Sequence, residues 1–332
     1  MARPVILFSG QWVDLTLEEL AQKTAEWGYQ GIELCCWGDH FEVQRALSEE
    51  GYCQAKLDML SRLELSAHVL ASHRVGQAVC DPIDSRHQEI LPDYVWGDGQ
   101  PEEVQQRAVE EMMATVRAAE KLGVGIVSGF TGSSLWSSVV GYPSPSAARV
   151  ALGLQDFARK WNPILDVCRD CGVKFAFEVH PGQIAFDLYS AEMALDALNG
   201  REEFGFTFDP SHLYWQGIDP AEFLHRFPER IFHVHFKDAV ITLNGRKGLL
   251  NSYLPSGNAR RGWDFRSPGR GSIDWEAVIR ALNAIGYEGP LSVEWKDAGM
   301  DREFGAEEAC KFVRRLNFEP GPHVEDRAFR EG

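Results

Sequence analysis

The feature that most constrains the fold of this chain is a regular alternation of short apolar runs with longer amphipathic segments. The runs expected to form strands are 5–8, 32–34, 65–69, 124–128, 173–178, 204–209, 231–236 and 291–295. The segments expected to form helices are 16–27, 43–61, 102–121, 147–170, 190–199, 219–226, 274–285 and 305–316. Such alternation is typical of a parallel sheet covered by helices, and about eight repeats favour closure into a single (β/α)₈ barrel.

The alternative α/β architecture is an open, doubly wound sheet. Its dinucleotide-binding form carries a G-x-G-x-x-G motif after the first strand, and this chain has no such motif there. Two long segments, 74–101 and 239–272, follow predicted strands at the face where barrel enzymes place their active sites. We therefore expect one barrel over residues 1–318, with functional loops, and a polar tail over 319–332.

The net charge limits the kinds of partner that the protein can bind, and the cysteine content indicates the cell compartment in which it is expected. The formal net charge of −16 disfavours binding to nucleic acid or to an anionic membrane surface. The seven cysteines show no disulfide framework, the N-terminus lacks the pattern of a signal peptide, and no apolar run reaches the roughly 18 residues that a membrane span needs. We expect a cytoplasmic protein whose partner is a small molecule.

Four residues with metal-binding side chains end the last four predicted strands: Glu178, Asp209, His235 and Glu294. In a closed barrel these strand ends meet at one mouth. Three carboxylates crowded there would repel one another unless a cation joined them, and this donor set suits a divalent ion, with Mn²⁺ ahead of Mg²⁺, Co²⁺ and Zn²⁺. His233 shares the face of His235 and is the alternative ligand on that strand.

Such a site is suited to proton transfer next to a carbonyl group. The ion polarises the carbonyl and stabilises the enediolate that forms when the neighbouring proton leaves, while a nearby carboxylate serves as acid or base. For any one of the four residues alone, the simpler explanation is an ordinary polar side chain at the end of a strand. Four in succession, each closing an apolar run, indicate a shared metal site.

Several motifs resemble the xylose-isomerase-like barrel superfamily, which includes sugar isomerases, ketose 3-epimerases, inosose dehydratases and endonuclease IV. They are GYQGIEL at 28–34, SAHVL at 66–70, FEVHPG at 177–182, FDPSHL at 208–213, HVHFKD at 233–238 and SVEWKD at 292–297, and the resemblance spans residues 5–316. It implies that Glu178, Asp209, His235 and Glu294 are the ligands in that order. It further implies that Glu178 and Glu294 are the catalytic acid/base pair and that His212 binds substrate.

The chain also departs from the ketose epimerases. His180 follows Glu178 by two residues and so points the same way on a strand, and the segment 239–272 is long. In both respects the chain resembles the barrel subunits of C-glycoside deglycosidases and related enzymes that act on 3-oxo-glycosides, which implies a catalytic role for His180 as the base. The alternative is that His180 only orients a neighbouring carboxylate.

Several further residues are candidates for the site, and each also has an ordinary structural explanation. His68, expected at the end of the third strand, matches a histidine that lines the pocket in this superfamily, but it is equally compatible with the core. Trp37 is suited to stack on a sugar ring, whereas most aromatic residues simply pack. Lys237 and Arg270 are candidates to bind substrate oxygens, although surface ion pairs are the default for both. Glu33, on the second predicted strand, is a further candidate, and its ordinary alternative is to pair with a barrel lysine or arginine.

The first functional hypothesis is thus a divalent-metal-dependent sugar isomerase or epimerase. The alternative is a lyase that cleaves the anomeric bond of an oxidised glycoside. Inosose dehydration and endonuclease IV-like DNA repair are two less favoured hypotheses. DNA repair needs further metal ligands and a basic groove, which the net charge disfavours. A binding module without catalysis is opposed by the complete set of four ligands. A homo-oligomer or a small partner subunit is implied only by analogy.

Overall fold

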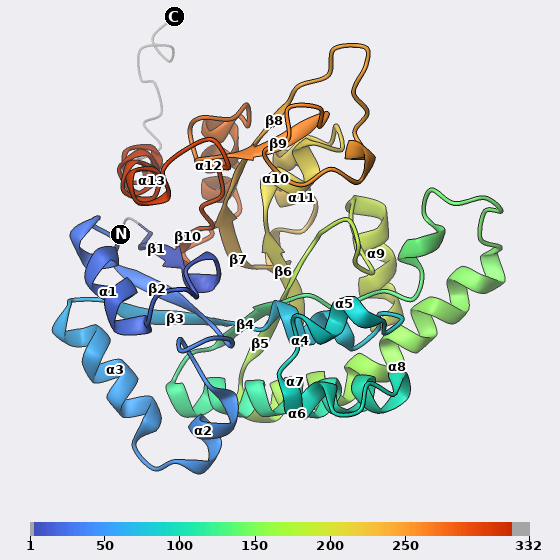
Figure 1. Cartoon of the computed structure of the whole chain (residues 1–332), viewed down its shortest axis with the longest axis horizontal. Helices are drawn as coiled ribbons and strands as arrows, with labels where there is room; N and C mark the ends of the chain where they lie inside the picture. Colours follow the sequence, from blue (N-terminus) through green and yellow to red (C-terminus); the bar gives the residue numbers. More distant parts are fainter. Residues whose placement is uncertain (1–2, 321–332) are drawn as a thin grey trace, which may run out of the picture.

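Eight parallel strands close into a barrel in the computed structural model, which describes residues 3–320 (Figure 1). The hydrogen-bonded order is β1-β10-β7-β6-β5-β4-β3-β2, so the last strand returns to the first. The strands are β1 (Val5–Phe8), β2 (Gly31–Cys35), β3 (Ser66–Ala71), β4 (Ile126–Gly129), β5 (Lys174–Glu178), β6 (Phe204–Phe208), β7 (Ile231–Phe236) and β10 (Leu291–Val293). The predicted (β/α)₈ barrel is confirmed.

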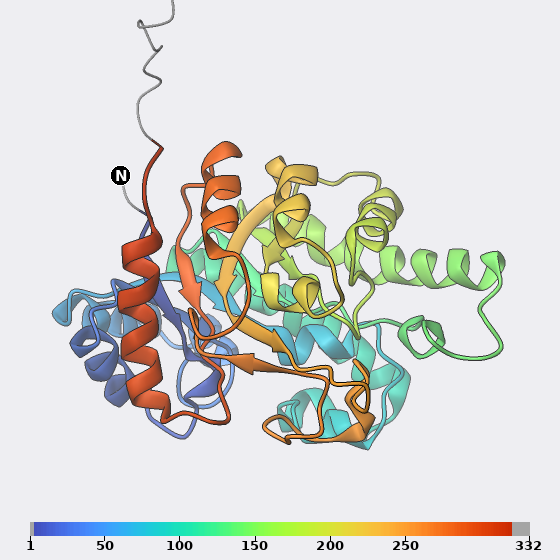
Figure 2. The same cartoon turned by 90° about the horizontal axis from the view of Figure 1, so that it is seen from above.

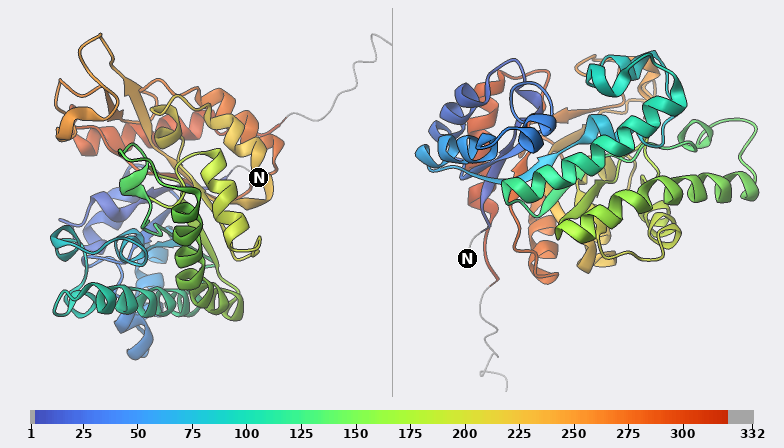
Figure 3. Two further views of the ribbon diagram at one scale, coloured as in Figure 1. Left: turned by 90° about the vertical axis from the view of Figure 1, so that its right-hand side faces the viewer. Right: turned by 90° about the horizontal axis from the view of Figure 1, so that it is seen from below.

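Helices surround the barrel, and the long α7 and α8 lie side by side along one flank (Figures 2 and 3). The helices are α1 (Leu17–Glu26), α2 (Val43–Ser48), α3 (Tyr52–Arg62), α4 (His73–Ala78), α5 (Ser85–Gln88), α6 (Asp93–Trp96), α7 (Pro101–Leu122), α8 (Ala147–Cys171), α9 (Leu188–Ala197), α10 (Pro210–Tyr214), α11 (Pro220–Arg226), α12 (Trp275–Ala284) and α13 (Arg302–Leu316). The capping box that Thr16 and Glu19 predict is present at the start of α1. Across residues 3–320, no helix combines the length and apolar character that crossing a lipid bilayer requires.

Side-chain alternation along the strands separates the core from the site. Phe175 and Phe177 of β5 are fully buried, and Phe175 packs against Trp161 of α8 with ring centroids 4.4 Å apart. Every second residue therefore faces the helices, and the residues between them face the barrel interior. The same alternation aims Glu178 inward, at the open carboxyl end of the strand.

Two long segments contain more regular structure than the sequence predicts. The segment 74–101 contains most of α4 and the short helices α5 and α6. The segment 239–272 contains most of an antiparallel ribbon, β8 (Asp238–Ile241) with β9 (Trp263–Arg266). Both lie on the face that carries the strand carboxyl ends, where α4 directly follows β3 and the ribbon follows β7 (Figure 1).

Several element boundaries differ from the sequence-based prediction by a few residues, and two of these differences are informative. The single helix expected over 43–61 is wrong: α2 and α3 are separate, because Gly51 adopts a left-handed conformation (φ 81°) that interrupts the helical path. The third strand extends to Ala71, past the predicted end at residue 69. The predicted tail 319–332 lies outside the described residues except for its first two positions, so its boundary stays a prediction.

Candidate metal centre

The four side chains singled out by the sequence meet at the carboxyl end of the barrel. Glu178, Asp209, His235 and Glu294 each offer one ligand atom, and these atoms all lie within 4.8 Å of one another. All four residues are buried, with Glu294 the most exposed at 7%. They come from β5, β6, β7 and β10 or from the residue directly after the strand, and these strands are consecutive neighbours in the barrel. The spatial convergence on which the metal hypothesis depends is present.

Atoms of this cluster have the properties of unused metal ligands. Glu178 Oε1, Glu294 Oε2 and His235 Nδ1 are buried and have no hydrogen-bond partner among the described residues. His235 Nδ1 and Glu294 Oε2 approach to 3.1 Å without hydrogen-bond geometry. Burying several acceptors without donors is costly, and a shared divalent cation removes that cost. The donor set therefore fits a divalent ion.

A layer beneath the cluster fixes the tautomer of His235. Glu33 of β2 accepts hydrogen bonds from Ser292 Oγ (2.7 Å), His233 Nε2 (2.8 Å) and His235 Nε2 (3.0 Å). The Nε2 proton of His235 is thus committed to Glu33, which leaves the Nδ1 lone pair facing the other ligands. The expected pairing of Glu33 with a lysine or arginine is wrong, because two imidazoles take that place.

Glu33, His233 and His235 are themselves close enough to hold an ion. However, their facing atoms already satisfy one another by the hydrogen bonds to Glu33. Burial alone would lower the pKa of His235, but the carboxylates of Glu33 and Glu294 raise it well above its usual value, so an ion bound at Nδ1 would displace a proton from that atom. This layer is therefore a support for the ligands above it.

Lys237 lies inside the cluster and not at the surface. Its Nζ is 2.8 Å from Glu294 Oε1, 3.1 Å from Asp209 Oδ2 and 3.1 Å from His212 Nε2, and the residue is buried. The ordinary alternative for Lys237, an ion pair at the protein surface, is therefore wrong. One ammonium among the carboxylates of Glu178, Asp209 and Glu294 leaves a formal charge of −2, which a divalent ion balances.

Three further histidines border the carboxylates. His212 Nε2 is 3.2 Å from both Glu178 Oε1 and Asp209 Oδ2. The ring centroid of His180 is 3.8 Å from that of His212. His180 Nδ1 donates to the Pro181 carbonyl oxygen at 2.5 Å, which leaves Nε2 as a free acceptor. Burial, and after it the neighbouring His212, lowers the pKa of His180 to about 3, so the ring is neutral.

The third of these histidines, His73, was not anticipated, and neither was Gln11. His73, the first residue of α4, places Nε2 2.8 Å from Glu178 Oε2. Gln11, just after β1, donates from Nε2 to Glu294 Oε1 at 3.0 Å, while its own Oε1 is buried without a partner within residues 3–320. Both follow strand ends, so a correct end for the third strand would have drawn attention to His73.

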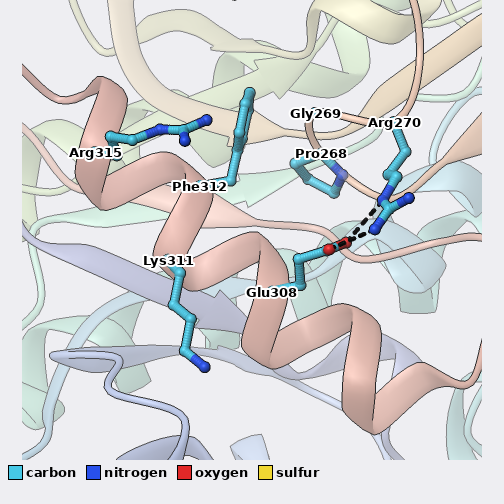
Figure 4. Close-up of a pocket in the computed structure, with 7 residues that line it drawn as sticks. All are labelled: Pro268, Gly269, Arg270, Glu308, Lys311, Phe312 and Arg315. Carbon is cyan, nitrogen blue, oxygen red and sulfur yellow. Dashed lines mark hydrogen bonds and ion pairs between the residues drawn. The ribbon is translucent and has the colours of Figure 1, made fainter.

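Other candidates lie apart from the cluster. His68 is in the first half of β3, not at its end, and it contacts Ser66 Oγ at 2.8 Å. The expectation that His68 ends the third strand is therefore wrong. Arg270 is exposed and forms a bidentate ion pair with Glu308 of α13 (2.9 and 2.5 Å), beside a surface cavity of about 480 Å³ (Figure 4). Arg270 thus forms a surface ion pair, which was its ordinary alternative to substrate binding.

Trp37 borders the site. Its indole packs edge-on against Phe8 of β1 and against His73, with ring centroids 6.1 and 6.4 Å apart. Phe8 in turn stacks on His235 with ring centroids 5.4 Å apart. Trp37 is therefore separated from the metal ligands by one layer of side chains.

Comparison with curated proteins finds partial relatives. The chain is 29% identical over 160 residues to the uncharacterised protein YfiH of Bacillus subtilis, covering 47% of this chain and 50% of YfiH. It is 29% identical over 133 residues to an inosose dehydratase of Clostridium botulinum, covering 40% of this chain and 44% of that enzyme. The chain thus spans about half the length of the curated relatives it matches.

Solved structures share the fold over nearly the whole chain. The probable 3-DHS dehydratase AsbF of Bacillus anthracis is 17% identical, with a TM-score of 0.65 and coverage of 94% of this chain and 98% of AsbF. The 3-keto-D-glucoside 4-epimerase YcjR of E. coli is 13% identical, with a TM-score of 0.65 and coverage of 94% and 99%. The IOLI protein, solved with a bound zinc atom, is 17% identical, with a TM-score of 0.61 and coverage of 94% and 96%.

A family model described as the xylose isomerase-like TIM barrel matches residues 21–316. That range covers the four clustered ligands and all but the first strand of the barrel. The chain belongs to the xylose isomerase-like TIM barrel family, which includes sugar epimerases and dehydratases.

Proposed function

We propose that this protein is a divalent-metal-dependent enzyme that removes a proton next to the carbonyl group of a sugar-like substrate and returns it as an isomerase or epimerase does. The observation that carries the proposal is the pair Glu178 and Glu294, each with one buried, unpaired carboxylate oxygen in the same cluster as Asp209 and His235. Mn²⁺ is the first ion to test, and the zinc atom in the solved structure of IOLI, which shares the fold, supports a divalent metal.

The roles of the residues follow from their positions. Glu178, Asp209, His235 and Glu294 would hold the ion, which when bound supplies positive charge that stabilises an enediolate. One of the carboxylates Glu178 and Glu294 takes the proton from the substrate carbon, and the other delivers a proton to the opposite face. Lys237 holds Asp209 and Glu294 in place by its ammonium contacts, and its charge also favours an anionic substrate state.

A second candidate function begins with the same proton abstraction but ends in elimination. The base takes the proton next to the carbonyl, the bond from the adjacent carbon to its oxygen substituent breaks, and that oxygen leaves with a proton as water or an alcohol. The free Nε2 of His180 favours this candidate, because the ring contacts a backbone carbonyl rather than orienting a carboxylate. The inosose dehydratases among the relatives add support.

The test incubates the manganese-loaded protein in D₂O with a ketohexose, an inosose and a 3-oxo-glycoside, and follows the products by NMR. Deuterium at the carbon next to the carbonyl, with the carbon skeleton and all hydroxyl groups kept, supports the isomerase or epimerase. Loss of water or release of an alcohol identifies the elimination. A protein that binds no divalent ion and exchanges no proton in any of these compounds contradicts both candidates.

Replacement of His180 separates the two candidates further. We expect His180→Gln to abolish elimination and to leave deuterium exchange by the carboxylate pair measurable. The matched control is His225→Gln, at an exposed position near the end of α11 and outside the cluster. Equal loss of exchange and elimination in His180→Gln would show that His180 is not specific to either outcome.

A further inference from the structure

One buried amide, the side chain of Gln183, joins the segments that follow β3, β4 and β5. Gln183 lies just after His180 in the sequence and is 3% exposed. Its Oε1 accepts hydrogen bonds from the backbone N–H groups of Thr131 (3.0 Å) and Gly132 (2.8 Å), which follow β4. Its Nε2 donates to Gln77 Oε1 on α4, the helix that follows β3. Both ends of this side chain therefore hold a neighbouring segment.

Further contacts connect the segment after β4 to α4. Gly132 has a left-handed backbone (φ 66°), and a Cβ at this position would overlap the carbonyl oxygen of Gln77. Asp81, which follows α4, accepts hydrogen bonds from Gln77 Nε2 (2.6 Å) and from the Ser133 N–H group (2.8 Å). These two segments and Gln183 thus form one hydrogen-bonded block.

The block carries three aromatic rings at the edge of the metal centre, one on each segment. Phe130, which follows β4, packs edge-on against His180, with ring centroids 5.1 Å apart, and against His73, with ring centroids 4.8 Å apart. His73 is the first residue of α4. His180 begins a turn that the backbone of Gln183 closes, since the Gln183 N–H group donates to the His180 carbonyl oxygen at 3.0 Å. Gln183 is therefore connected to all three ring-bearing segments.

The His180 ring depends on this block for its position. It forms no hydrogen bond to another side chain within residues 3–320, because its Nδ1 bonds the Pro181 carbonyl oxygen and its Nε2 is free. Its remaining ring contacts are to Phe130 and His212. Gln183 itself forms no hydrogen bond to the four proposed metal ligands in the described chain. Any effect of Gln183 on the site therefore passes through the rings that the block holds.

We infer that Gln183 is a positioning residue for His180. By fixing the turn at His180 against the segment that carries Phe130, it keeps the free Nε2 of His180 in the place where a base is needed. This inference rests on the proposed function, and specifically on the elimination in which His180 takes the proton. Gln183 thereby favours elimination over simple proton exchange and takes no part in proton transfer itself.

Gln183→Met tests this role, because it keeps the length of the side chain but leaves two backbone N–H groups without an acceptor. In the manganese-loaded protein, with an inosose as the substrate, we expect kcat for elimination to fall at least about tenfold. KM and the rate of deuterium exchange should stay within about twofold. A merely structural role would lower elimination and exchange together. The matched control is Gln106→Met, exposed on α7 and bonded to Glu110.

A second measurement does not depend on activity. Diethyl pyrocarbonate modifies a histidine at a free ring nitrogen, and peptide mass spectrometry of the metal-free full chain gives the rate at His180. We expect this rate to rise at least about tenfold in Gln183→Met, because releasing the turn lowers the cost of local opening. The exposed His225 is the internal reference, whose rate should not change.

Gln77→Met provides a milder variant if Gln183→Met fails to fold. It removes the acceptor of the Gln183 Nε2 donor but leaves both bonds from Gln183 to the backbone after β4 in place. We expect the rate of modification at His180 to rise in this variant as well, by a smaller factor than in Gln183→Met.

An unchanged rate of modification at His180 in these variants would overturn the inference, as would equal losses of elimination and exchange. Failure of the proposed function has a different signature: the wild-type protein binds no Mn²⁺ and produces neither elimination nor exchange. In that case, or if deuterium exchanges without elimination, the dependence of the His180 modification rate on Gln183 still decides whether Gln183 positions this ring.

Discussion

At the scale of single residues, the site depends on a carboxylate that faces away from the proposed metal. Glu33 accepts three hydrogen bonds, and two of them hold His233 and His235 by Nε2. An amide at this position would present NH₂ to at least one of these donors. The ligand geometry of His235 is thus set by a residue on β2, which is separated from β7 by β1 and β10 in the barrel order.

We therefore expect Glu33→Gln to weaken binding of Mn²⁺ by about 10- to 100-fold, as loss of a hydrogen-bonded carboxylate behind a metal-binding histidine does elsewhere. The measurement is competition for Mn²⁺ against a fluorescent chelator. Glu18→Gln is the control, since Glu18 is exposed on α1. Unchanged affinity in Glu33→Gln would show that His235 keeps its orientation without Glu33.

Glu294→Gln tests the acid/base pair. We expect turnover to fall by orders of magnitude, because both the ligand charge and the proton-transferring group are lost. The fold should be retained, which circular dichroism and the thermal unfolding curve check. Asp301→Asn, an exposed helix cap in the loop that follows, is the control for a general effect of charge. Turnover like that of the wild type would remove Glu294 from the mechanism.

A local sequence pattern predicts the direction of a side chain on a strand but not in the segment that follows the strand. Glu178, Asp209, His235 and Glu294 follow apolar runs, so strand periodicity points to them. His73 and Gln11 lie in the segments after strands, where no period fixes the direction of a side chain. Lys237 was a candidate to bind substrate oxygens, with a surface ion pair as the ordinary alternative, and only the assembled barrel shows that it is enclosed by carboxylates.

At the scale of elements, the long helix α8 packs against β5 and β6, the strands that lead to Glu178 and Asp209. Trp161 of α8 is fully buried and packs on Phe175, while Phe157 of the same helix packs on Phe204 of β6. Strand alternation then couples this packing to the site, because Glu178 is on the same strand as Phe175 but faces the interior.

Removing the largest of these contacts should destabilise the whole domain. We expect Trp161→Ala to lower the free energy of unfolding by about 3–5 kcal/mol, since a large buried side chain is replaced by a cavity. Leu152→Ala on the same helix is the control: Leu152 is 61% exposed, and we expect a change within about 0.5 kcal/mol. Denaturant titration of both variants measures the difference, and equal stabilities would contradict the importance of this packing.

Sequence periodicity predicted which segments are strands and which are helices, but it did not predict where a helix or a loop is interrupted. The eight strands and the long helices α7 and α8 have the predicted order. The division between α2 and α3 depends on Gly51, which a helical pattern tolerates until the backbone is known. The ribbon β8–β9 was taken for a loop, because its pairing joins residues on either side of a long connection and leaves only a weak local signal.

At the scale of the whole molecule, the charge of −16 and the buried acidic cluster both favour a cation. A ligand that binds only the native state raises the free energy of unfolding by mass action. The protein is therefore expected to be more stable with its ion than without it.

Removal of the ion with EDTA should accordingly lower the midpoint of thermal unfolding by several degrees relative to protein saturated with Mn²⁺. At a free ion concentration 100-fold above Kd the stabilisation is about 2.7 kcal/mol. Glu178→Gln should show a smaller shift at the same Mn²⁺ concentration, because one ligand charge is missing. Identical midpoints with and without Mn²⁺ in the wild-type protein would argue against a metal in this cluster.

The barrel order has a consequence for how such a protein diversifies. β5, β6, β7 and β10 are consecutive around the ring and deliver the four ligands, whereas β1 to β4 deliver none of them. The strands β1 and β2 instead position side chains that contact those ligands: Gln11 follows β1 and bonds Glu294, and Glu33 of β2 bonds His235. Substitutions there would alter how firmly the four ligands are oriented while the ligand atoms themselves stay the same, so affinity for an ion can change without any change of ligand.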